Sequence, residues 1–306
     1  MNVNIRWIEM IDHMPTSIKV ELKRSWSVAK GISDGLKQLM GRKVVPAFWA
    51  EALNFGDLLT PALLRSYGVL PKFTQCQGNC IPCARTLVSC GSILGWIGED
   101  FSGYVLGSGL GMESEGKAMP NAKFLCVRGA LTRAAMGLDN SVLLGDPGLL
   151  SDRLFNAKTV EKKYKIGIVP HQIEHDGASV SSFLSKLQIG AVKLKLISTR
   201  RFPLEVIKDI ASCEYIISSS LHGLVISDAF GIPSARVCFG QKIGDFKFWD
   251  YFSAYDEPSV TYDARDVRSV NDVVSICKLP EERLSRIAQL KIGLASSYEK
   301  YLKEVL

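Results

Sequence analysis

Short apolar runs alternate with amphipathic segments from residue 43 onward, and Gly, Ser or Asp follows most of the runs. This pattern predicts buried strands that alternate with helices. In the first half, we expect strands or strand-like runs at 43–51, 86–94, 103–110, 123–129 and 141–150, the last ending in a Gly-Asp-Pro turn. The helices expected between them cover 54–68, after a short loop, and 130–138.

The second half repeats the alternation after a charged segment at 151–165, which we interpret as a linker. Strands are predicted at 165–171, 193–199, 214–220 and 232–240, and helices at 180–188, 203–213 and 221–231. A long final helix is predicted from Pro280, because proline is favoured at a helix start and two glutamates follow in the first turn.

Strand, polar loop and helix in repeated order indicate an α/β fold with two Rossmann-like parallel sheets that face a cleft. We assign residues 1–42 to an N-terminal extension, 43–152 and 163–278 to the two domains, and 279–306 to the C-terminal helix. Ligands of such folds bind beyond the carboxyl ends of the strands. The positions to inspect are therefore Asn54–Asp57, Gly107–Gly111, Arg128, Asp146, His171 and Ser218–His222.

The extension contains a basic amphipathic segment, in which Trp26, Val28, Ile32 and Leu36 recur at helical spacing among lysines and arginines. Such a helix can lie on an anionic membrane surface. Docking on the protein itself is the interpretation we favour, since solvent-facing helix surfaces are commonly charged.

Composition narrows the class of protein. The chain of 306 residues is 47% hydrophobic and 22% charged, as packed globular proteins are, and its formal net charge is +6. This mild, dispersed charge suits an anionic small ligand better than nucleic acid. The sequence shows no apolar signal core near the start and no apolar stretch of about 20 residues. The eight cysteines are expected to be reduced. We therefore predict a cytoplasmic protein that can contact the inner face of the plasma membrane.

The stretch CQGNCIPC has the spacing C-x3-C-x2-C at Cys76, Cys80 and Cys83, and Cys90 follows. Thiolates at such spacing can hold an iron–sulfur cluster or a structural zinc ion. Cys90 falls inside an apolar run and is expected to pack in the sheet. We favour thiols in a loop and expect no metal.

The stretch YIISSSLHGLVISDAFGIP offers a different chemistry, because a strand ends in hydroxyl residues and His222 opens the next helix. The amides of a helix N-terminus, here near Ser220, Leu221 and Gly223, attract phosphate or carboxylate. His222 can then act as acid, base or hydrogen-bond donor, although a histidine in an ordinary turn would look the same.

Several short motifs together resemble the polysaccharide pyruvyl transferase family over roughly residues 45–255. They are Asn54-Phe55-Gly56-Asp57, Gly107-Ser108-Gly109, Val127-Arg128-Gly129, Leu144-Gly145-Asp146-Pro147, Leu221-His222, Gly231-Ile232-Pro233 and the later Lys242. The resemblance implies a fold like that of GT-B glycosyltransferases, with an N-terminal acceptor side and a C-terminal donor side. It also implies transfer of the enolpyruvyl group of phosphoenolpyruvate onto two hydroxyls of a saccharide as a cyclic ketal.

By this resemblance, His222 is the catalytic residue, and Arg128 and Lys242 bind the donor with Ser220, Leu221 and Gly223. Asn54, Asp57 and Ser108 are the expected acceptor-side residues, although Asp57 can equally be a helix cap. Phosphoenolpyruvate is then a co-substrate and no cofactor is expected. The other partner is a lipid-linked or nucleotide-linked saccharide of an exopolysaccharide or cell-surface polysaccharide.

The sequence departs from the family at Ser220, where some members carry an arginine, so a second grip on the donor must come from His171, Arg200 or Arg201. Two other functions stay open. A glycosyltransferase of similar shape would use an acidic residue for the ribose of a nucleotide sugar, and Asp228 is the nearest one. A non-catalytic relative would serve as a scaffold for polysaccharide synthesis.

Overall fold

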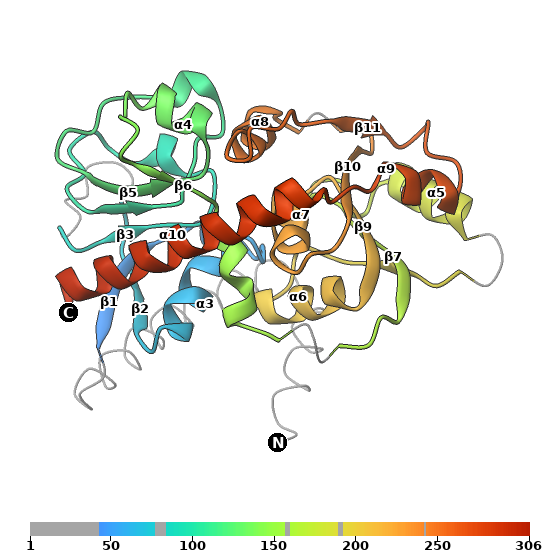
Figure 1. Cartoon of the computed structure of the whole chain (residues 1–306), viewed down its shortest axis with the longest axis horizontal. Coiled ribbons are helices and arrows are strands. Elements are labelled where there is room, and N and C mark those ends of the chain that lie inside the picture. The colour runs from blue at the N-terminus through green and yellow to red at the C-terminus, as the bar shows by residue number, and fades with distance from the viewer. Residues whose placement is uncertain (1–42, 77–83, 157–159, 189–191, 242) are drawn as a thin grey trace, which may run out of the picture. The chain divides into compact units, whose positions relative to one another are not determined.

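A computed structural model describes residues 43–76, 84–156, 160–188, 192–241 and 243–306 (Figure 1). The chain divides into two compact units, residues 1–44 and 45–306. The predicted N-terminal extension and its basic helix lie outside the described residues. Both sheets belong to the second unit, except for Val44 at the start of the first strand.

The first sheet has six strands in the order β2-β1-β3-β4-β5-β6, and the pairs from β1 through β6 are parallel. The strands are β1 (Val44–Phe48), β2 (Leu70–Phe73), β3 (Leu87–Val88), β4 (Tyr104–Leu106), β5 (Lys123–Val127) and β6 (Leu143–Leu144). The helices of this half are α3 (Leu59–Ser66), α4 (Ala130–Ala135) and the 3-10 turns η1 (Leu94–Trp96), η2 (Glu113–Glu115) and η3 (Pro147–Arg153).

The second sheet has five parallel strands in the order β11-β10-β9-β7-β8. They are β7 (Tyr164–Val169), β8 (Leu194–Leu196), β9 (Cys213–Ser218), β10 (Ser234–Cys238) and β11 (Thr261–Asp263). The helices that follow or connect them are α5 (Ala178–Leu187), α6 (Pro203–Ala211), α7 (Leu221–Ala229), α8 (Phe246–Ser253) and α9 (Val270–Ile276).

Burial explains why these segments form these elements. Strand β7 presents Ile166, Ile168 and Val169 to the interior, as expected of a parallel strand covered on both faces. Helix α6 buries Val206, Ile207 and Ile210 at helical spacing. Each such side chain contributes about 1.5–3 kcal/mol when fully buried, so the two sheets organise the core.

Helix α10 (Glu281–Val305) contacts strands β4, β5 and β6 of the first sheet and helix α7 of the second half, and it appears as the long red helix of Figure 1. The Tyr298 hydroxyl lies 2.6 Å from the Ser89 hydroxyl just after β3, and the Tyr301 hydroxyl donates to the carbonyl of Arg85. Nearer the middle of the helix, the Lys291 ammonium donates to the carbonyl of Ala229 at the end of α7. The helix therefore ties together the two halves of the described unit.

The structure confirms two parallel α/β sheets and the C-terminal helix. The sequence analysis missed β2, β11, α8 and α9, and the segment read as a linker contains the end of η3 and the start of β7. The proposed domain boundaries at 152 and 163 stay predictions. Within the described residues, no helix combines the length and apolar character needed to cross a membrane.

Replacement of Leu294 by alanine should cost about 2–5 kcal/mol of unfolding free energy, because this fully buried side chain of α10 packs against Gly145. Ile292→Ala on the same helix is the control, since Ile292 is 72% exposed and its loss should change stability by about 0.5 kcal/mol or less. Urea unfolding of both variants measures the difference. Equal losses would show that α10 is not anchored as the structure has it.

Candidate active site

A tight turn after β9 brings His222 to the start of α7. Strand β9 ends at Ser218, whose hydroxyl accepts from the amide of Ser220 and lies 2.9 Å from the carbonyl of Val169. A Cβ at Gly223 would lie 2.2 Å from that hydroxyl oxygen, so only glycine lets the helix begin this close to the strand. The run Ser-Ser-Ser-Leu-His-Gly thus fixes where His222 enters the site.

The imidazole of His222 is enclosed by the loop after β1. Its ring meets Phe55 edge to face, with centroids 6.1 Å apart. A Cβ at Gly56 would lie 2.0 Å from Nδ1 of His222. The ring therefore occupies the space that any side chain at position 56 would need, and only glycine fits there. The side chain of His222 is 12% exposed. The Asn-Phe-Gly-Asp motif of the first half therefore forms one wall around the histidine of the second half.

Asp146 faces the other ring nitrogen. Its Oδ2 lies 3.9 Å from Nε2 of His222, too far for a hydrogen bond, and neither atom has a partner among the residues described. Its Oδ1 accepts from the amide of Gly148 and so caps η3. The Gly-Asp-Pro-Gly turn therefore presents one carboxylate oxygen to the histidine with the other already held.

The surroundings of His222 keep it neutral near pH 7. Burial lowers the pKa of the imidazole, and the charges of Arg128 and Lys247 lower it further, while Asp146 acts in the opposite direction. A buried neutral imidazole with an unpartnered Nε2 can accept a proton and pass it on. The carboxylate of Asp146 would stabilise the imidazolium that forms.

Arg128 is fully buried at the end of β5, where it forms an ion pair with Asp250 of α8. Its Nε donates to Asp250 at 2.8 Å, and its terminal nitrogens donate to the Ser92 hydroxyl and the Leu110 carbonyl. These bonds use three of the five N–H groups of an arginine. Asp250 also accepts from the backbone and hydroxyl of Thr132. The pair thus fixes α8 against the start of α4.

Helix α8 places Lys247 in the same cluster. Burial, Arg128 and Arg236 lower the pKa of Lys247 to about 8, and Asp57 opposes them. Its ammonium lies 3.5 Å from Nε2 of His171. Burial, with a smaller contribution from Lys247, lowers the pKa of His171 to about 4. Lys247 therefore stays largely protonated near neutral pH, and His171 does not.

Asp57 is the acidic member of the cluster. Burial raises the pKa of its carboxyl to about 6, and Lys247 partly offsets this effect. Nearby, the side chain of Asn54 accepts from the amide of Gly56 and donates to Gln172 of the second half. Asn54 thus holds the loop that carries Gly56 and Asp57.

The remaining sequence candidates lie in different settings. The Ser108 hydroxyl is buried and donates to the carbonyl of Gly91, and Ser220 and Leu221 are buried at the start of α7. Arg200 binds Asp176 and the carbonyl of Gln172, while Arg201 pairs with Glu205 and Asp209. Lys242 lies outside the described residues. The roles assigned to these residues from sequence stay predictions.

The cysteine stretch is only partly described. Cys76 is buried and its thiol lies 3.5 Å from the carbonyl of Thr74, while Cys80 and Cys83 fall outside the described residues. Cys90 is buried after β3, as expected, and burial raises the pKa of its thiol. Across the described part of the chain, no group of three or more His, Cys, Asp or Glu residues is placed to hold a metal ion.

Sequence reasoning missed Lys247 and gave Asp146 no role. Lys247 lies in a helix rich in aromatic residues, where the surrounding pattern gave no sign of a site. Asp146 was noticed only because it follows a strand. The signal that could have identified it is the Gly on both sides of Asp-Pro, which marks a turn where backbone and side chains approach closely.

Comparisons with known proteins find a similarity to the same family that the motifs resemble. The model of the family described as polysaccharide pyruvyl transferase matches residues 87–237. The chain is 29% identical over 228 residues to succinoglycan biosynthesis protein ExoV of Rhizobium meliloti (strain 1021), an alignment covering 72% of this chain and 67% of that protein.

Two further similarities are more limited. The chain is 33% identical over 160 residues to the uncharacterised protein L143 of Acanthamoeba polyphaga mimivirus. This alignment covers 49% of this chain and only 54% of the length of that relative. The crystal structure of the glycosyltransferase SnogD from Streptomyces nogalater aligns with a TM-score of 0.40 and 11% identity, over 86% of this chain and 99% of the other.

Substitution of Gly56 by alanine should destabilise the protein by about 1–3 kcal/mol, because the new methyl group would occupy the space of the His222 ring. Gly98→Ala is the matched control, since a methyl group there meets open space. Thermal unfolding of both variants measures the cost. A Gly56→Ala protein as stable as the control would contradict the close packing of this loop on His222.

Replacement of Lys247 by methionine should raise the pKa of His171 from about 4, because a neighbouring positive charge is removed. The value should stay below 6.5, since burial is the larger cause of the depression. NMR titration of the imidazole measures it, with the exposed Lys300→Met as control. An unchanged pKa of His171 would show that the Lys247 ammonium does not lie beside the imidazole.

Proposed function

We propose that the chain is a member of the polysaccharide pyruvyl transferase family, whose model matches residues 87–237, and that it transfers the enolpyruvyl group of phosphoenolpyruvate onto two hydroxyls of a saccharide. The product is a cyclic pyruvate ketal, and phosphate is released. The observation that carries the proposal is the neutral, buried His222 held between Gly56 and Asp146 beside Arg128 and Lys247. The succinoglycan biosynthesis relative supports a role in making an exopolysaccharide or another cell-surface polysaccharide.

The charges of the cluster suit this donor. Phosphoenolpyruvate carries a phosphate and a carboxylate, and enclosed cations bind such groups strongly. Lys247 and Arg128 supply positive charge, and Arg128 lies close enough to Lys247 to lower its pKa. Lys247 can provide the second grip that the family's arginine would give at Ser220, since Arg200 and Arg201 are occupied by acidic partners.

Arg128 has two roles in this proposal. Its positive charge favours an anion in the cluster, and its bonds to Asp250 hold α8, from which Lys247 extends. Lys242 is retained as a donor residue on the basis of the family motif alone.

The proton balance gives His222 its task. The two acceptor hydroxyls lose their protons and become ether oxygens on C2 of the donor. C3 gains one of these protons and becomes a methyl group, while the bond from C2 to the phosphate oxygen breaks and phosphate leaves with the other. A neutral imidazole can accept a hydroxyl proton and deliver it, and Asp146 stabilises the charged intermediate form of the ring.

The acceptor side of the proposal involves Asn54, Asp57 and Ser108. Asp57 can accept a hydrogen bond from a sugar hydroxyl, while Asn54 positions its loop. Ser108 acts through the backbone it holds, because its hydroxyl already donates to Gly91. The saccharide is proposed to be lipid-linked or nucleotide-linked. A cytoplasmic location with peripheral membrane contact stays a prediction.

Binding of phosphoenolpyruvate tests the proposal without knowledge of the acceptor. At about 100 times its dissociation constant, the ligand should add about 2.7 kcal/mol of stability. Lys247→Met should weaken binding about ten- to a hundredfold through the loss of a charged contact, and Lys300→Met should not. No stabilisation by phosphoenolpyruvate, together with stabilisation by a nucleotide sugar, would favour a glycosyltransferase and reject the proposal.

The pH dependence of this binding should follow Lys247. Its charge is lost as pH rises through about 8, so affinity for phosphoenolpyruvate should fall between pH 7 and pH 9. Lys247→Arg should bind equally well at both values, because an arginine stays protonated. Calorimetric titration at several pH values measures the trend. A wild-type affinity independent of pH in this range would exclude Lys247 as a donor contact.

A further inference from the structure

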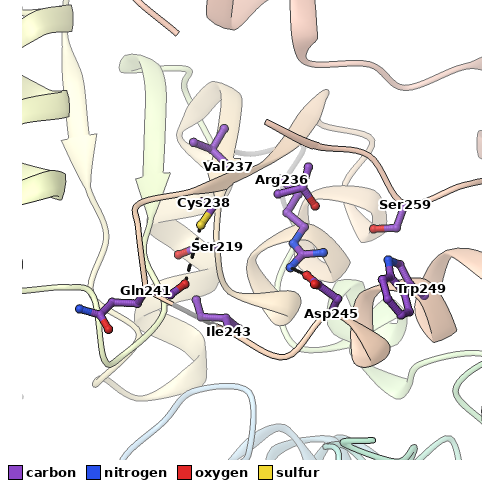
Figure 2. A pocket seen from close by; sticks show the side chains of 10 residues that line it. Ser219, Arg236, Val237, Cys238, Gln241, Ile243, Asp245, Trp249 and Ser259 are labelled. Carbon is purple, nitrogen blue, oxygen red and sulfur yellow. Dashed lines mark hydrogen bonds and ion pairs between the residues drawn. The ribbon is translucent and has the colours of Figure 1, made fainter. Parts of the chain in front are cut away.

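A pocket of about 430 Å³ lies at the β10–β11 edge of the second sheet (Figure 2). Its lining includes Ser219, Arg236, Asp245, Trp249, Ser259 and Thr261. Such a volume is within the range of small-molecule sites, about 300–1,000 Å³. The pocket is larger than a single inorganic ion requires.

Arg236 is the cation of this pocket. Its side chain is only 6% exposed, stacks on the ring of Phe248 at 3.6 Å and pairs with Asp245, as the dashed line in Figure 2 shows. Its Nη1 is buried and has no hydrogen-bond partner in the described part of the chain. A buried guanidinium nitrogen without a partner is costly, so a site built this way favours a ligand that supplies an acceptor atom.

Ser259 provides a second unused group in the same lining. Its hydroxyl oxygen is also buried without a partner in the structure as described. A serine hydroxyl and a guanidinium can both donate, and the Thr261 hydroxyl lies in the same wall. Several donors and one buried cation select an anion with several acceptor oxygens, as a phosphate has.

Trp249 and Asp245 point to what accompanies the phosphate. Half of the Trp249 side chain is exposed beside the pocket, and a flat indole face packs well against a ring. Asp245 is about half exposed, and its carboxylate can accept hydrogen bonds from hydroxyl groups. A ring bearing hydroxyls and attached to a phosphate combines these features.

We propose that this pocket binds the sugar phosphate of the acceptor, with a phosphate on Arg236 and Ser259 and the sugar ring on Trp249. This inference rests on the proposed function and names its acceptor as a glycosyl phosphate or diphosphate. A nucleoside diphosphate sugar and a prenyl diphosphate sugar share this chemistry.

The pocket adjoins the cluster around His222. Ser219 lines it three residues before the histidine, and its hydroxyl accepts from the amide of His171. The positive charge of Arg236 is one cause of the lowered pKa of Lys247. In this proposal, a sugar held by its phosphate at Arg236 extends toward His222.

Tryptophan fluorescence and calorimetry of the full chain test the inference with glucose 1-phosphate, uridine diphosphate glucose, a short prenyl diphosphate glucose and free glucose as probes. We expect the phosphorylated probes to bind and free glucose not to. Arg236→Gln should weaken their binding about tenfold or more, and Ser259→Ala about three- to tenfold. The stronger of the two diphosphate probes identifies the source of the acceptor.

Matched variants separate binding from folding. Arg265→Gln removes an arginine that also pairs with a neighbouring aspartate but lies outside the pocket lining, so it should leave binding unchanged. Trp249→Leu should abolish the fluorescence change at an exposed position. If Arg236→Gln unfolds, Ser259→Ala and Trp249→Leu still test the pocket, because they leave the ion pair of Arg236 intact.

Competition distinguishes this inference from the proposed function. Phosphoenolpyruvate and glucose 1-phosphate should bind together, each with an affinity little changed by the other. Mutually exclusive binding would overturn the separate acceptor site, as would binding of free glucose equal to that of glucose 1-phosphate or unchanged binding in both Arg236→Gln and Ser259→Ala. Sugar-phosphate binding without any binding of phosphoenolpyruvate would instead reject the proposed function.

Discussion

The contact between Gly56 and the imidazole of His222 is the constraint on which the site depends. The loop after β1 reaches across so closely that a single methyl group on Gly56 would collide with Nδ1. Its position is fixed by bonds to the second half, from the amide of Phe55 to the carbonyl of Thr199 and from Asn54 to Gln172. One half therefore closes the space around His222 of the other half.

Buried charge supports this arrangement at a cost. A fully buried ion pair such as Arg128 and Asp250 gives little net stability, and breaking it would leave an isolated charge inside the protein. Here Asp250 also accepts hydrogen bonds from Thr132, and Arg128 also donates hydrogen bonds to Ser92 and Leu110. The pair is consistent with a role in positioning α8, whose Lys247 would otherwise lack a fixed place beside His171.

The cluster gives opposite pKa changes to groups that lie near each other. Burial raises the pKa of Asp57 to about 6 and lowers that of Lys247 to about 8, while His222 is lowered by the same effect. A carboxyl group and an ammonium group that titrate near neutrality, beside a neutral imidazole, are suited to moving protons. An anionic substrate would raise the pKa values of Lys247 and His222 again, because it stabilises the charged forms of both side chains.

The sequence was informative where local pattern and chemistry agreed. Alternating apolar runs predicted both parallel sheets, and the strand–turn–helix at His222 was predicted within a residue or two because small residues and glycine permit that turn. The short strands β2 and β11 and helix α8 were missed, since Pro71 weakens the first and aromatic residues in α8 mask its period. Asp146 and Lys247 could not be assigned, because their roles arise from contacts between segments far apart in sequence.

The pKa of His222, measured by NMR with and without saturating phosphoenolpyruvate, tests the central claim most directly. A donor bound in this cluster brings several negative charges beside the ring, so the imidazole pKa should rise from its depressed value on binding. Occupancy is established independently by calorimetry on the same sample. A saturated protein in which the pKa of His222 is unchanged would contradict the account, because the donor would then lie elsewhere.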